Sequence, residues 1–195
     1  MVKLLTTEDL WGREEYEQQR DAFRRKIMAA KQPRRVLVGP NCSVHIENRD
    51  IMRYQVLEML RAEGTWDDPQ AVADELEAYN PLISRPNLLS VTMMFEYPTE
   101  EERETELPKL VGIDRHFWLA IGESDPVLGE FDAGQIDEDK VSSVQFVKFP
   151  LDDEQQSHLA QAGTVARLII DHPHYTAQAV LGEQTRECIA ADLSA

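Results

Sequence analysis

Two short β-prone runs, residues 36–38 and 42–46, are separated by only Gly39-Pro40-Asn41. Glycine, proline and asparagine each favour turn geometry, so the second run folds back beside the first. The spacing therefore predicts a tight antiparallel hairpin near the start of the chain.

The second run alternates in polarity. Side chains point to opposite faces of a strand at successive residues, so one face is apolar and the other polar. The apolar face carries Cys42, Val44 and Ile46, and the polar face carries Ser43, His45 and Glu47.

Helical signals surround this hairpin. Apolar residues recur at helical spacing over residues 13–31, and Pro33 follows that run. Asn48 is a plausible N-cap for a helix over residues 49–63, which Gly64 ends. Asp68-Pro69 begins a further helix. Short strands and helices alternate through the rest of the chain.

These elements predict an α+β fold with a mixed, mainly antiparallel sheet covered by helices. We expect a single domain over residues 1–195, in which the N-terminal helix 13–31 packs on an α+β body formed by residues 34–195. A chain of this length can bury a core without disulfides or metals.

Charge narrows the possible partners. The 195 residues carry 20 Lys and Arg against 36 Asp and Glu, a net charge of −16. Such a body repels phosphate backbones, so we expect it to bind neither nucleic acid nor anionic membranes. The basic stretch at residues 31–35 is a possible exception. Alternatively, this stretch is the C-terminus of a helix, where cations complement the helix dipole.

The two cysteines, Cys42 and Cys188, are far apart and have no metal-site spacing. They indicate buried thiols in a reducing compartment, although the sequence does not exclude a disulfide. The chain begins without an apolar leader and has no run of 18 apolar residues, so we expect a soluble, cytoplasmic protein.

Familiar catalytic signatures are absent. The sequence has no glycine-rich phosphate loop, GxSxG, HExxH, paired CxxC or EF-hand loop. These absences argue against nucleotide binding through a standard loop. They also argue against an iron–sulfur cluster held by this chain alone.

The region from Glu47 to Glu63 contains the first candidate site. On a helix, Gln55 and Glu58 lie on one stripe, and Glu47 precedes that helix. One interpretation is a ligand-binding site made of Glu47, Arg49, Gln55 and Glu58 in one buried network, with His45 as a neighbouring metal ligand. The other is a structural network or a solvated stripe.

The second candidate is His172-Pro173-His174, between two expected strands. Its two imidazoles, together with His45, could serve iron or zinc. An HxH pair supplies only two of the three or four ligands that such metals need. Turn chemistry explains the segment equally well.

Several segments resemble a known bacterial family, domain-of-unknown-function family 3501, in the same order along nearly the whole chain. They are residues 34–40, residues 47–63, residues 75–83, Phe95-Glu96-Tyr97-Pro98 and Asp171-His172-Pro173-His174-Tyr175. The resemblance implies a cytoplasmic, single-domain protein. It also implies that genes of this family lie beside genes for rubrerythrin-like di-iron proteins and iron–sulfur oxidoreductases. It provides no catalytic residues that could be assigned to this sequence.

Two functional hypotheses follow. The first is an accessory or binding protein of a redox, iron–sulfur or di-iron system, acting through a protein partner or a small ligand. The second is a metal-dependent enzyme or metal-binding protein that uses a His/Glu site. The residues leave open whether the protein is an enzyme.

The charge generates a testable expectation. At about 0.15 M salt, where long-range attraction is largely screened, the protein should not bind duplex DNA detectably in a gel-shift assay. Micromolar binding that disappears when Arg34 and Arg35 are replaced would contradict this expectation and favour a regulator instead.

Overall fold

A computed structural model of the chain describes residues 3–133 and 141–194. Its α-helices are α1 (Arg13–Lys31), α2 (Arg49–Glu63), α3 (Pro69–Tyr79), α4 (Glu100–Glu106), α5 (Asp153–Ala160) and α6 (Glu183–Leu193). Its strands are β1 (Arg35–Leu37), β2 (Cys42–Ile46), β3 (Leu88–Phe95), β4 (Phe117–Ile121), β5 (Val127–Leu128), β6 (Glu130–Phe131), β7 (Val144–Pro150), β8 (Ala166–His172) and β9 (Tyr175–Val180).

The described strands form two sheets. One has the order β1-β2-β3-β7-β6 and the other the order β5-β4-β8-β9. The α+β class and the first hairpin are confirmed, with Val36 opposite Val44 in an antiparallel pair. The strands divide between two sheets instead of joining one, and every strand pair in the described residues is antiparallel.

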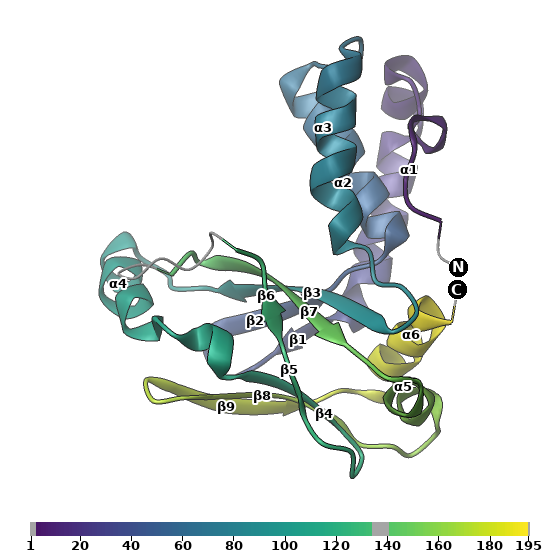
Figure 1. The fold of residues 1–195 in the computed structure, drawn as a ribbon. Helices are drawn as coiled ribbons and strands as arrows, with labels where there is room; N and C mark the ends of the chain where they lie inside the picture. Colours follow the sequence, from purple (N-terminus) through teal and green to yellow (C-terminus); the bar gives the residue numbers. More distant parts are fainter. Residues whose placement is uncertain (1–2, 134–140, 195) are drawn as a thin grey trace.

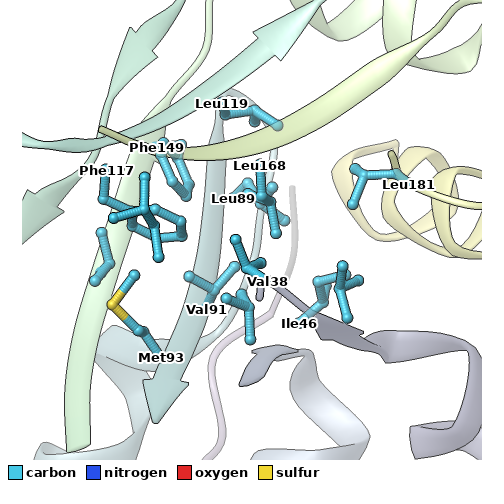
Figure 2. Packing of buried hydrophobic residues seen from close by; sticks show 14 of the residues in the cluster. Val38, Ile46, Leu89, Val91, Met93, Phe117, Leu119, Phe149, Leu168 and Leu181 are labelled. Atoms are coloured by element: carbon cyan, nitrogen blue, oxygen red, sulfur yellow. The ribbon is translucent and has the colours of Figure 1, made fainter. Parts of the chain in front are cut away.

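The larger core lies between the two sheets. Val44 and Ile46 of β2 are fully buried there, as the alternation along this strand predicts. The rings of Phe117, from β4, and Phe149, from β7, meet edge to face with centroids 5.2 Å apart. Figure 2 shows Ile46, Phe117 and Phe149 gathered with side chains of the neighbouring strands.

Helices α1, α2 and α3 form a second layer with its own core. Tyr16, Phe23 and Ile27 of α1 pack with the apolar face of α2, and Phe146 of β7 packs against the same cluster. Figure 1 shows the three helices rising from the five-stranded sheet on the side away from the four-stranded one. The five-stranded sheet is therefore the middle layer of the molecule.

Local sequence determines where α2 begins and ends. The side chain of Asn48 accepts a hydrogen bond from the backbone N–H of Ile51, which satisfies one free donor of the first turn. Gly64 ends the helix in the left-handed region, with φ of 71°, where a residue without Cβ is least strained. The expected bounds of this helix are confirmed.

The C-terminal helix is attached to the start of the central sheet by an ion pair. Arg34, immediately before β1, donates through both terminal nitrogens to Asp192 of α6. Asn48 adds a third hydrogen bond to the same carboxylate at 3.3 Å. Both charged side chains are largely buried. Among residues 3–133 and 141–194, no helix is long and apolar enough to cross a membrane.

Breaking the Arg34–Asp192 pair should destabilise the fold. Asp192→Ala leaves a buried guanidinium uncompensated, so we expect the free energy of unfolding to fall by about 3 kcal/mol. Urea denaturation measures this loss. Glu187→Ala, at an exposed position of the same helix, is the matched control, and an equal effect of both changes would contradict the prediction.

Candidate functional site

A cavity of about 600 Å³ lies between the helical layer and the outer face of the five-stranded sheet. Figure 1 shows the two layers that enclose it, α1 to α3 and strands β1, β2, β3 and β7. Its wall combines charged, polar and apolar side chains: Met28, Lys31, Gln32, Arg35, Leu37, His45, Glu47, Met52, Gln55, Tyr79, Leu82, Thr92, Met94, Val144 and Phe146.

The alternation along β2 brings two titratable groups to this cavity. Because Val44 and Ile46 face the core between the sheets, His45 and Glu47 face the helices. Thr92 of β3 pairs with His45 in the strand register. The three side chains therefore share one patch of the sheet's outer face.

Glu47 is the most deeply buried acid of the site. It is only 7% exposed, and its Oε1 accepts a hydrogen bond from the Thr92 hydroxyl at 2.7 Å. Burial raises the pKa of Glu47, while Thr92, Lys31 and Arg34 oppose the shift. Among the described residues this carboxyl group has no ion pair, and no side chain bonds its Oε2. A buried carboxyl group is thus left with one oxygen available to a ligand.

His45 belongs to a hydrogen-bonded chain that leads out of the cavity. Its Nε2 lies 3.2 Å from the Ser43 hydroxyl, and that hydroxyl donates to Glu96 Oε1 at 2.5 Å. Arg35 donates to the same carboxylate at 3.0 Å. The Ser43 bond, followed by the charge of Arg35, holds the pKa of Glu96 below its usual range.

The surroundings of His45 disfavour its charged form. Burial lowers the pKa of His45, and the cations Arg35 and Lys31 lower it further, whereas Glu96 acts in the opposite direction. At neutral pH the ring is therefore the neutral imidazole, which can act as a base or as a metal ligand.

The family model DUF3501, described as a protein of unknown function, matches residues 4–193. The chain belongs to this family. The resemblance read from the sequence is thereby confirmed.

A solved structure has the same fold. It is a novel protein of unknown function from Burkholderia pseudomallei K96243, determined at 1.90 Å resolution. It is 31% identical to this chain, with a TM-score of 0.91, and the match covers 98% of this chain and 100% of the other. No curated protein matches the chain. The relatives therefore establish the fold of the DUF3501 family. They are themselves of unknown function, so the function has to be inferred from the site.

The structure separates the four residues expected in one ligand site. Glu47 and Gln55 line the cavity, but Glu58 points to α1, where it accepts hydrogen bonds from the Tyr16 hydroxyl at 2.5 Å and from Arg20 at 2.7 and 2.8 Å. The expectation of a single network is wrong, because α1 packs along the flank of α2 that carries Glu58.

Arg49 also lies outside the cavity. Its guanidinium donates to the backbone carbonyl of Lys3 at 2.6 Å and forms an ion pair with Asp9 at 2.6 Å. These contacts attach the N-terminal segment to α2. Arg49 therefore pairs with Asp9 and does not compensate the carboxyl group of Glu47.

The histidines expected as metal ligands do not come together. His45 lines the cavity, whereas His172 and His174 flank the hairpin turn between β8 and β9 in the other sheet. His172 is 4% exposed, with Nε2 bonded to the Val111 carbonyl and Nδ1 accepting the backbone N–H of His174. Within residues 3–133 and 141–194, no group of three or more His, Cys, Asp and Glu side chains is arranged to hold a metal.

Sequence reasoning missed several side chains of the site: Lys31, Arg35, Ser43, Tyr79, Thr92 and Glu96. Thr92 alternates with Val91 and Met93 along β3, which marks it as facing away from the core. That alternation could have indicated its face. Nothing local indicates that it lies beside Glu47, because the two are 45 residues apart.

The structural role of Glu58 gives a prediction with a defined pH dependence. Hydrogen bonding from Arg20, assisted by Tyr16, lowers the pKa of Glu58 from 4.5 to about 2. Its contribution to stability is therefore present above about pH 4.5 and is lost as the pH falls towards 2.

We expect Glu58→Gln to lower the free energy of unfolding by about 2 kcal/mol at pH 7, between the values for exposed and buried ion pairs. Denaturant titrations at pH 7 and pH 3 should show the difference shrinking at the lower pH. The exposed Glu63→Gln on the same helix is the control. A Glu58→Gln protein as stable as the wild type would show that the pair is not structural.

Proposed function

We propose that the protein binds a small organic ligand in the cavity between α1–α3 and the five-stranded sheet. The near-complete burial of Glu47, without an ion pair among the described residues, carries this proposal. Burying a carboxyl group costs several kcal/mol unless it is compensated. A ligand that forms a hydrogen bond with the available oxygen supplies that compensation.

The cavity has the size and composition of a ligand site. Its volume of about 600 Å³ falls in the range of small-molecule pockets, which combine apolar walls with a few polar groups. Glu47, Met52, Leu82 and Thr92 are buried and form its floor. Leu37, 60% exposed, lies at its rim.

Charge at the rim indicates the polarity of the ligand. Lys31 and Arg35 lie at this cavity in a chain with a net charge of −16. Cations at an opening attract an anionic group, whereas Glu47 inside requires a hydrogen-bonding partner. The proposed ligand thus has an anionic end at the rim, an apolar body, and a polar group that hydrogen-bonds with Glu47 at the floor.

We place this binding activity in an accessory role within a redox, iron–sulfur or di-iron system. The support for that setting is the genomic neighbourhood that the family resemblance implies. Native mass spectrometry and absorbance spectra of protein purified without a tag identify any retained ligand. A redox-active or iron-containing ligand supports the role, and a ligand of another kind contradicts the role but not the cavity.

The alternative function is a metal-dependent enzyme or metal-binding protein that uses His45 and Glu47. Its support is the position of both side chains at one cavity. Elemental analysis of the same untagged protein separates the two proposals. Stoichiometric zinc or iron that is lost in His45→Ala favours the alternative.

Filling the cavity should abolish binding without unfolding the protein. Met94 is half-buried and lines the cavity from β3, so Met94→Trp places an indole in the ligand's space. A ligand at 100 times its dissociation constant stabilises the wild type by about 2.7 kcal/mol, which corresponds to a rise of roughly 5–10 °C in Tm.

A thermal-shift screen of small metabolites measures this effect. We expect compounds that raise the Tm of the wild type to leave the Tm of Met94→Trp unchanged. Val180→Trp is the control, because Val180 is 60% exposed on β9 and does not line the cavity. Stabilisation that persists in Met94→Trp would place the ligand elsewhere.

A further inference from the structure

The hydrogen bonds around His45 define which ring nitrogen carries its proton. Glu96 is a carboxylate, because its pKa is lowered, and it can only accept a hydrogen bond. The single hydroxyl proton of Ser43 therefore points to Glu96 Oε1, 2.5 Å away. The Ser43 oxygen must then accept its other bond from His45, 3.2 Å away, so His45 carries its proton on Nε2.

This arrangement leaves Nδ1 of His45 as an unprotonated acceptor. No described residue forms a hydrogen bond with Nδ1, and the ring lines the cavity. A neutral imidazole with one nitrogen held by a hydroxyl–carboxylate chain is the arrangement that activates histidine as a general base. The hydroxyl of Ser43 is no nucleophile here, because its side chain is fully buried.

Glu47 is suited to act with this base. It follows His45 by two residues on the same face of the chain, about 7 Å away along an extended strand. Glu47 lines the same cavity, is 7% exposed and has no ion pair among the described residues. A carboxyl group buried without a cation beside it favours the protonated form, in which it can donate its proton.

We infer that the cavity catalyses proton transfer on its ligand, with His45 Nδ1 as the general base, Glu47 as the proton donor, and Ser43 and Glu96 as positioning residues. The inference rests on the proposed function, since it requires a ligand in the cavity. The substrate class is a carbonyl compound that bears a hydrogen on the carbon next to the carbonyl group.

The step is balanced without an oxidant or a metal. His45 takes the proton from that carbon, and the released electron pair forms a carbon–carbon double bond. The π pair of the carbonyl group moves to its oxygen, which takes the proton of Glu47. His45 then returns its proton to carbon and the enol returns its proton to Glu47, so both residues are restored. The product is an isomer of the substrate, or the substrate with that hydrogen exchanged for one from solvent.

A chromogenic probe tests the base without knowledge of the natural substrate. In 5-nitrobenzisoxazole, loss of the ring C–H proton to a base forms a nitrile as the N–O bond breaks, and the oxygen leaves as a coloured phenolate. We expect the wild type to accelerate this reaction above buffer. His45→Gln, whose amide can still donate to Ser43, should reduce the rate by about 100-fold, the lower range for general-base catalysis.

His158→Gln is the matched control. His158 is also a partly exposed histidine beside a serine, with Nδ1 3.2 Å from the Ser124 hydroxyl, but it has no serine-to-carboxylate chain among the described residues. It should retain the full rate. No rate above buffer in the wild type, or a rate that His45→Gln retains, overturns the inference.

The pH profile tests the positioning residues. The rate should rise with pH through the pKa of His45, which lies below the ordinary value of 6.5. Lys31 and Arg35 lower this pKa and Glu96 raises it. Glu96→Gln removes the raising charge and releases Arg35, so the midpoint should move to lower pH while the plateau rate falls. An unchanged midpoint contradicts the positioning role.

Histidine nitrogen NMR provides a readout that does not depend on any variant folding. The spectrum of the wild type should show His45 as the Nε2–H tautomer, and an Nδ1–H tautomer overturns the inference. The thermal-shift comparison of the wild type with Met94→Trp tests ligand binding in the cavity independently of base catalysis. Cavity binding without base catalysis therefore rejects this inference alone, whereas absence of cavity binding rejects the proposed function.

Discussion

Strands β2 and β3 have to bury both of their faces, and the rest of the structure depends on this requirement. Along β2, Cys42, Val44 and Ile46 meet the second sheet, while Ser43 on the opposite face of the strand is equally buried. A sheet covered on both sides needs a partner for each polar group on either face. On the outer face, Thr92 of β3 supplies the partner of Glu47 from within the sheet itself.

The elements whose bounds depend on neighbouring residues were predicted well. Asn48 and Gly64 define α2, and Gly39-Pro40-Asn41 defines the first hairpin, because capping and turn preferences act over a few residues. The division into two sheets was missed, since strand pairing depends on contacts between distant segments. Alternation in a single strand does not show which strand will lie beside it.

The candidate site was predicted in part for the same reason. The polar face of β2 brings His45 and Glu47 towards one cavity, and Gln55 joins them from α2. Glu58 was assigned to that group from its spacing to Gln55, but Arg20 and Tyr16 lie 38 and 42 residues away and compete for it. The spacing of residues along the sequence predicts which side of a helix each one occupies. Which residue lies against that side depends on tertiary packing.

The ion pair between Arg34 and Asp192 has a consequence for how the molecule is made. The two partners lie 158 residues apart along the chain, so Arg34 emerges from the ribosome long before Asp192. Until α6 has been synthesised, the guanidinium beside β1 lacks its carboxylate, and the segment that carries Lys31 and Arg35 to the cavity lacks its anchor. Helical and sheet layers can assemble as they appear, but this junction closes only when α6 joins them. A polypeptide truncated before Asp192 would therefore keep the junction between α6 and the central sheet open.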